Sequence, residues 1–177
     1  MNKKIIAAIR GSWELEEAVK SDVLMVFMLN PNIEDIKAQT EMAHKNGKKF
    51  FIHIDLAEGI GKDEYGIRFV KNVGVDGIIS TRTNIIKAAS KLGVHTVQRF
   101  FIVDSHSVNT IVETAKQSKA DMIEIMPGTV TKVIKRMKKE LEIPIIAGGL
   151  IETQAEINEA FLSGASAIST GKSELWG

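Results

Sequence analysis

Two short turns near the end of the chain have the composition of a phosphate-binding site. A pair of glycines follows an apolar run, and a second turn with two hydroxyls and one ammonium group opens a short predicted helix. Glycine lets backbone N–H groups approach an anion without a Cβ in the way, and a helix start supplies further N–H groups. We therefore predict a phosphate cradle formed by Gly148, Gly149, Thr170, Gly171, Lys172 and Ser173.

The second of these turns is not a nucleotide-binding P-loop. Such a motif needs a glycine five residues before Gly171, and that position is Ser166. Because ordinary turns also use glycine, the glycines alone do not indicate a phosphate site. The position of the two turns in the chain favours one. Both turns follow the last two predicted strands, which is where (β/α)₈ barrels bind phosphate.

Charged side chains in otherwise apolar segments form a second candidate set. Asp55 and Glu124 are carboxylates of predicted strands, where an unpaired buried charge would be costly. Arg10 and Arg99 are available cations. Two interpretations remain open: the four residues bind the hydroxyls of a small phosphorylated polyol, or they form a structural ion-pair network.

Patterns for catalysis and metal binding are weak. A Schiff-base aldolase needs a lysine on a strand, and no predicted strand ends in one. His53 has the right type for a general base, as the two carboxylates do, but it lies in no motif. The spacing of His53, Asp55, Glu124 and His106 is not specific for a metal site. We expect no catalytic residues, no metal ion and no cofactor.

Positive charge is concentrated in one predicted helix. Lys132, Lys135, Arg136 and Lys139 share one face of it, an arrangement suited to contacting the phosphates of a nucleic acid. The same pattern is typical of a solvent-exposed helix face. Because the net charge is only +1, any nucleic-acid role requires such a local patch.

Short apolar, β-branched runs alternate with amphipathic segments along the whole chain, which predicts alternating strands and helices. The capping-box spacing of Thr153 and Glu156 predicts the start of a helix that ends near Gly164. The predicted strands are Ile5–Ile9, Val23–Met28, Phe50–Ile54, Gly77–Ser80, Val94–Ile102, Met122–Met126, Pro144–Ala147 and Ala167–Ser169.

This alternation predicts an α/β fold, either a closed (β/α)₈ barrel or an open doubly wound sheet. The absence of an early Gly-x-Gly-x-x-Gly turn and the position of the two phosphate turns favour the barrel. Barrels usually need about 200 residues or more. We therefore predict a minimal TIM-type barrel, a single domain over residues 1–177, with the last helix reduced to Lys172–Trp176.

Composition excludes several classes of protein. With 44% hydrophobic and 25% charged residues, the chain is neither disordered nor fibrous. The apolar runs are too short to span a membrane. The lack of cysteine excludes disulfides and thiolate metal sites and fits a reducing compartment. We expect a cytoplasmic protein with no membrane association.

Several sequence blocks, each weak alone, are specific in their order and spacing. They include His53-Ile-Asp55-Leu, Gly77-Ile-Ile-Ser-Thr-Arg82, Gln98-Arg-Phe-Phe-Ile-Val-Asp104, Glu124-Ile-Met-Pro-Gly128, Ile143-Pro-Ile-Ile-Ala-Gly-Gly149 and Ser169-Thr-Gly-Lys-Ser-Glu-Leu-Trp176. Together they cover nearly the whole chain. In these blocks the chain resembles the glycerol uptake operon antiterminator regulatory proteins.

The resemblance implies a TIM barrel used for sensing in glycerol metabolism. Such a bacterial regulator binds glycerol 3-phosphate as effector and acts on leader RNA, so that transcription passes a terminator before glycerol-catabolism genes. The phosphate would occupy the cradle, and Arg10, Asp55, Arg99 and Glu124 would lie nearest the glycerol moiety. A homodimer would double the basic patch across a two-fold axis. The alternative is a small barrel enzyme, an isomerase or epimerase of a phosphorylated three-carbon or sugar metabolite.

Overall fold

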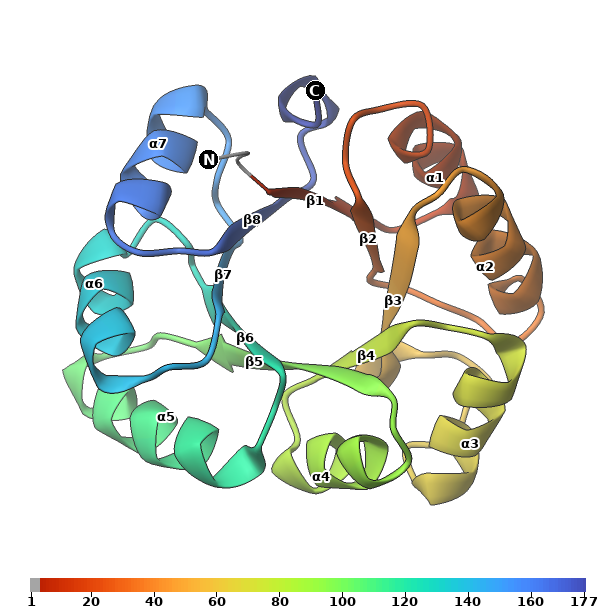
Figure 1. Cartoon of the computed structure of the whole chain (residues 1–177), viewed down its shortest axis with the longest axis horizontal. Helices are drawn as coiled ribbons and strands as arrows, with labels where there is room; N and C mark the ends of the chain where they lie inside the picture. The colour runs from red at the N-terminus through yellow and green to blue at the C-terminus, as the bar shows by residue number, and fades with distance from the viewer. Residues whose placement is uncertain (1–3) are drawn as a thin grey trace.

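Eight parallel strands close into a barrel in the computed structural model, which describes residues 4–177 (Figure 1). Each strand pairs with the next in the chain, and β8 pairs with β1, where Ile6 lies opposite Ser169. Residues 1–3 of the predicted domain lie outside the described residues. The strands are β1 (Ile5–Ile9), β2 (Met25–Met28), β3 (Lys49–His53), β4 (Gly77–Ser80), β5 (His95–Phe101), β6 (Met122–Met126), β7 (Ile145–Gly148) and β8 (Ala167–Thr170).

Seven α-helices surround the barrel in the described part of the chain, each following a strand (Figure 1). They are α1 (Ser12–Ala18), α2 (Ile36–Lys45), α3 (Glu64–Val73), α4 (Thr83–Lys91), α5 (Ser105–Ser118), α6 (Thr131–Glu140) and α7 (Gln154–Leu162). Two 3₁₀ turns complete the structure, η1 (Ile54–Leu56) and η2 (Ser173–Leu175). The predicted TIM-type (β/α)₈ barrel is confirmed.

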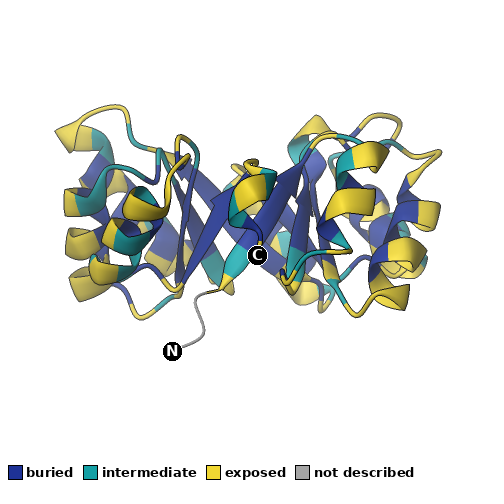
Figure 2. Cartoon of the chain, turned by 90° about the horizontal axis from the view of Figure 1, so that it is seen from above, coloured by how far each residue is buried: buried dark blue, intermediate teal, exposed yellow. Residues whose placement is uncertain are grey.

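The strands are buried on both faces, which explains why they read as nearly continuous apolar runs. One set of alternating residues fills the barrel interior, including Ile6, Phe51 and Ala167. The rings of Phe27 and Phe51 pack there with centroids 5.7 Å apart. The opposite set packs against the helices, and the exposed positions lie on the outer helix surfaces and loops (Figure 2).

Local sequence signals place the helix ends. The Thr153 hydroxyl accepts from the backbone N–H of Glu156, whose carboxylate accepts from the backbone N–H of Thr153, so the predicted capping box begins α7. Gly164, just beyond α7, has a φ of +105°, a conformation that favours glycine. No helix within residues 4–177 is long and apolar enough to cross a membrane.

The eighth helix is replaced by one 3₁₀ turn. The sequence predicts a short helix over Lys172–Trp176, and the structure shows η2 over the three residues Ser173–Leu175. Trp176 then folds inward, is 2% exposed, and donates from Nε1 to the Thr170 carbonyl oxygen at 2.9 Å. One large side chain thus covers apolar surface that an eighth helix would otherwise bury.

Candidate functional site

Four polar side chains face the barrel interior at the carboxyl ends of the strands. They alternate with residues of the apolar interior: His53 follows Phe51 by two positions, and Ser169 follows Ala167. The four side chains are all buried, and they belong to His53, Arg99, Glu124 and Ser169. The carboxyl end of a (β/α)₈ barrel is where ligands bind, so these residues define the candidate site.

A buried ion pair connects two of these residues. Arg99 Nε donates to Glu124 Oε2 at 2.6 Å, across the neighbouring strands β5 and β6. The second oxygen, Glu124 Oε1, is buried without a hydrogen-bond partner. Gly148 makes room for it, because a Cβ at that position would lie 2.3 Å from Glu124 Oε1. The structure thus brings Arg99, Glu124 and the glycine pair together.

His53 is neutral and unpaired inside the barrel mouth. Its pKa is lowered from 6.5 to about 4, mainly by burial and also by the nearby Arg99 charge, while the Asp55 charge opposes the shift. Neither ring nitrogen has a hydrogen-bond partner. Buried polar atoms normally have partners, so His53 and Glu124 Oε1 both have open hydrogen-bonding capacity at the carboxyl ends of their strands.

Asp55, expected on the third strand, lies just beyond the end of β3 and has protein partners of its own. It belongs to η1, just after β3, and its carboxylate accepts from Ser80 Oγ at 2.6 Å and from Thr81 N and Oγ1 at 2.8 Å each. Burial raises the pKa of Asp55, but these hydrogen bonds outweigh that effect and lower it overall. Asp55 therefore ties the end of β3 to the end of β4.

The two predicted phosphate turns lie side by side. Gly148 of β7 is paired with Ser169 of β8. Thr170 points to the helix side of its strand, where its hydroxyl donates to the Ile151 carbonyl oxygen at 2.8 Å. Lys172 is exposed, with Nζ 3.7 Å from Glu152 Oε1. The turns are therefore joined to each other at the barrel mouth.

The remaining predicted residues are on the surface. Arg10 is exposed at the end of β1, in alternation with interior-facing Ile6. The basic residues of α6 are all exposed, and Arg136 is held by Glu140, with Nε 2.8 Å from Oε1, and by Asn109. Within residues 4–177, no group of three or more His, Asp or Glu residues is arranged to hold a metal ion.

Sequence reasoning did not assign His53 or Ser169 to the ligand. Each of them lies two positions after an apolar residue and therefore on the same face of its strand. The sequence does not tell which face of a strand points inward. The unsatisfied Glu124 oxygen has no sequence signal.

Comparison with known proteins shows the family and the fold of the chain. Residues 5–176 match the family model described as glycerol-3-phosphate responsive antiterminator. The crystal structure of a glycerol uptake operon antiterminator regulatory protein from Listeria monocytogenes superposes with a TM-score of 0.93, at 36% identity, over 99% of this chain and 96% of that chain. A glycerol uptake operon antiterminator-related protein from Thermotoga maritima gives a TM-score of 0.88, at 35% identity, over 99% of both chains.

A curated relative extends the similarity to a third bacterium. The Escherichia coli protein YgcP, described as uncharacterized, is 37% identical over 173 residues, which are 97% of this chain and 91% of YgcP. The similarity therefore includes every strand and helix that positions the candidate site.

Proposed function

The chain belongs to the glycerol-3-phosphate responsive antiterminator family, and from this membership we propose that it binds glycerol 3-phosphate and leader RNA. With the effector bound, it promotes transcription antitermination in the leader of glycerol-catabolism genes. Leader RNA is made in the cytoplasm, so the proposal also places the protein there. Glycerol 3-phosphate acts as effector, and no cofactor takes part.

The observation that carries the effector site is the pair of unsatisfied polar groups in the barrel mouth. The glycerol hydroxyls supply the donors that Glu124 Oε1 lacks and both a donor and an acceptor for the neutral His53 ring. A polyol thus satisfies groups whose burial is otherwise unfavourable.

The phosphate is placed at the turns of the cradle, beside the polyol subsite. Gly148 lies beside the Glu124 carboxylate, where a Cβ would have no room, and is paired with Ser169, so the phosphate end of the ligand is placed next to its polyol end. Gly149, Gly171 and Ser173 contribute backbone groups, and the exposed cations Arg10 and Lys172 contribute charge. Asp55 acts by holding the end of β3, which carries His53, and Thr170 acts by joining the two turns.

The RNA surface is assigned to the basic face of α6. Lys132, Lys135, Arg136 and Lys139 are exposed along it. A homodimer doubles this face, which compensates for the net charge of only +1.

Exposed apolar side chains support a macromolecular partner at the same end of the barrel. Phe101 ends β5, and Trp13, Tyr65, Val103 and Leu150 lie in segments that follow strands; each of the five is more than half exposed.

A second function rests on the same two unpaired groups. A neutral histidine and a carboxylate at the same end of a barrel are the residue types that move protons in isomerases and epimerases. Such an enzyme converts its phosphorylated ligand, whereas a sensor returns it unchanged.

Isothermal titration calorimetry tests the effector site. The proposal predicts binding of glycerol 3-phosphate, much weaker binding of glycerol, and loss of glycerol 3-phosphate binding in the His53→Phe variant, with Asp76→Asn at the opposite end of the barrel as control. Phosphorus NMR of the incubated ligand separates the two functions. An unchanged spectrum supports the sensor, and a new resonance supports the enzyme.

A further inference from the structure

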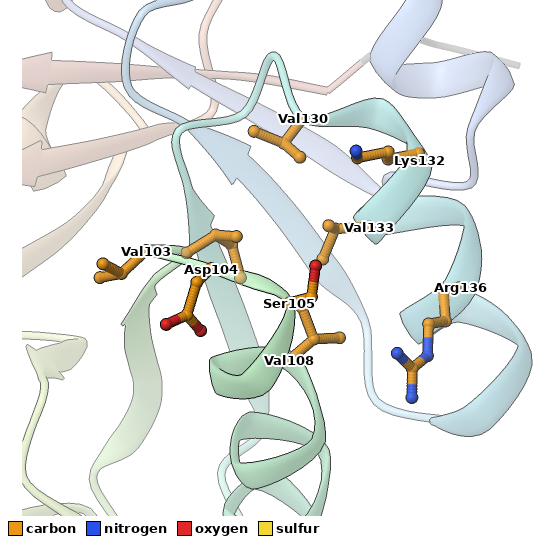
Figure 3. A pocket seen from close by; sticks show the side chains of 9 residues that line it. Val103, Asp104, Ser105, Val108, Val130, Lys132, Val133 and Arg136 are labelled. Atoms are coloured by element: carbon orange, nitrogen blue, oxygen red, sulfur yellow. The ribbon is translucent and has the colours of Figure 1, made fainter.

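A groove of about 420 Å³ lies beside the barrel mouth, between the starts of α5 and α6. Side chains of the β5–α5 loop and of α6 face one another across it (Figure 3). Val108, Val130 and Val133 form an apolar floor, and Val103, which is 83% exposed, stands at its edge. This volume is in the range of small-ligand sites.

Cations border the apolar floor on one side. Lys132 and Arg136 line the groove, and both belong to the exposed basic face of α6. Arg136 is held in place by hydrogen bonds to Glu140 and Asn109, the latter reaching across from α5. A fixed guanidinium beside an apolar floor combines a phosphate contact with a planar group on which a base stacks.

From this combination we infer that the groove binds one unstacked nucleotide of single-stranded RNA. The base enters the apolar floor beside Arg136, and the flanking phosphates contact Lys132 and the lysines further along α6. This inference rests on the proposed function, because it locates the RNA contact of the regulator. The charge of α6 favours RNA over an acidic peptide, because its cations continue along the helix beyond the groove in a row that suits successive phosphates.

The groove is also connected to the effector site through two strands. One wall is the β5–α5 loop with the start of α5, and the other is Val130 with α6; these segments come after β5 and β6, the strands that carry Arg99 and Glu124. Ile102, at the start of one wall, donates its backbone N–H to the Met126 carbonyl oxygen at 2.7 Å. A ligand that rearranges the Arg99–Glu124 pair therefore acts on the groove over a few residues. An effector shifts RNA binding only if it favours one state of such an element.

The test uses a charge placed at the exposed edge of the groove. Val103→Glu is expected to keep its fold and its calorimetric affinity for glycerol 3-phosphate, and to bind fluorescein-labelled leader transcript about tenfold more weakly, the size of one lost base contact. Leu162→Glu, equally exposed at the opposite end of the barrel, is the matched control and is expected to bind RNA like the wild type.

A second pair of variants and a cross-link make the location specific. Lys132→Ala is expected to reduce the slope of log K against log salt by about 1, whereas Lys87→Ala, an exposed lysine of α4, leaves it unchanged. Photocross-linking of transcript containing 4-thiouridine is expected to label peptides 102–108 or 130–136.

Wild-type RNA affinity in Val103→Glu with no cross-link at these peptides would overturn the inference, and the groove would then serve another occupant such as an acidic peptide. The proposed function would survive that result. If the wild type bound no leader transcript with or without effector, the proposed function and this inference would both fail.

Discussion

Arg99 Nε and Glu124 Oε2 lie 2.6 Å apart, with both side chains almost completely buried at the carboxyl ends of β5 and β6. The pair satisfies one carboxylate oxygen and leaves the other, Oε1, without a partner. Because the charges compensate each other, the open hydrogen-bonding capacity beside them suits the hydroxyls of a polyol.

The first prediction concerns Glu124→Gln. The substitution leaves the buried Arg99 without its counter-charge, so we expect the free energy of unfolding to fall by about 3–5 kcal/mol. Affinity for glycerol 3-phosphate is expected to disappear as well. Urea denaturation and calorimetry check the two effects.

A double variant separates stability from binding. Arg99→Met combined with Glu124→Leu removes both charges and keeps apolar volume, so it is expected to be more stable than Glu124→Gln while still failing to bind the effector. Effector binding by the double variant would show that the pair has no part in the ligand site.

The second prediction concerns acid stability. The pKa of His53 is lowered from 6.5 in the unfolded chain to about 4 in the fold, so the unfolded chain takes up this proton first. The contribution of neutral His53 to the free energy of unfolding is fully present above pH 6.5. About 2–3 kcal/mol of it is lost as the pH falls toward 4. In His53→Gln, the free energy of unfolding should change less between pH 7 and 4.5.

His95→Gln is the control for this measurement, because the side chain of His95 is 70% exposed. Asp55 and Asp76, whose pKa values are lowered, contribute mainly below about pH 4 and so do not interfere. Equal pH dependence in the wild type and His53→Gln would contradict a neutral, buried His53.

The third prediction distinguishes two glycines. In Gly148→Ala the new methyl group would lie 2.3 Å from Glu124 Oε1, so the carboxylate must move. We expect the free energy of unfolding to fall by about 1–3 kcal/mol and effector binding to be lost. In Gly171→Ala the nearest atom is the Ala8 carbonyl oxygen at 3.3 Å. That variant should fold normally and bind the phosphate more weakly; normal effector binding by both variants would rule out the cradle.

The fourth prediction concerns the opposite end of the barrel. Asp76 accepts from the Lys49 ammonium and from the backbone N–H of Phe50 at 2.8 Å each, and lies 2.7 Å from His44 Nε2. Asp76→Asn should lower the free energy of unfolding by about 1–3 kcal/mol and leave effector affinity unchanged. Weaker effector binding in Asp76→Asn would mean that a loss of stability alone weakens binding. The binding losses of the site variants would then not locate the effector site.

The fold could be predicted because each strand is short, apolar and bounded by an amphipathic helix. The limits of β1, β4 and β6 match the predicted ones, whereas β2 begins at Met25 and not at Val23. Hydrogen-bond pairing with the neighbouring strands sets such limits, and this pairing cannot be read from the hydrophobic pattern of a single strand.

The site could be predicted in part. That Asp55 and Glu124 need partners follows from the cost of a buried charge, but the sequence does not tell which residues those partners are. In the structure, Asp55 accepts hydrogen bonds from Ser80 and Thr81, 25 and 26 positions away, and Glu124 pairs with Arg99. The sequence predicts that Thr170 contacts the phosphate, but Thr170 lies on the helix side of β8, and the sequence does not show which face of a strand points inward. A direct contact of either Asp55 or Thr170 with the ligand stays a prediction.

We propose above all that glycerol 3-phosphate controls RNA binding. The most direct test is fluorescence anisotropy of labelled leader transcript titrated with the protein, with and without glycerol 3-phosphate, at one fixed moderate salt concentration. We expect tighter RNA binding with the effector and none of this increase in His53→Phe. Equal RNA affinity with and without effector, at concentrations where calorimetry shows the site filled, would contradict it.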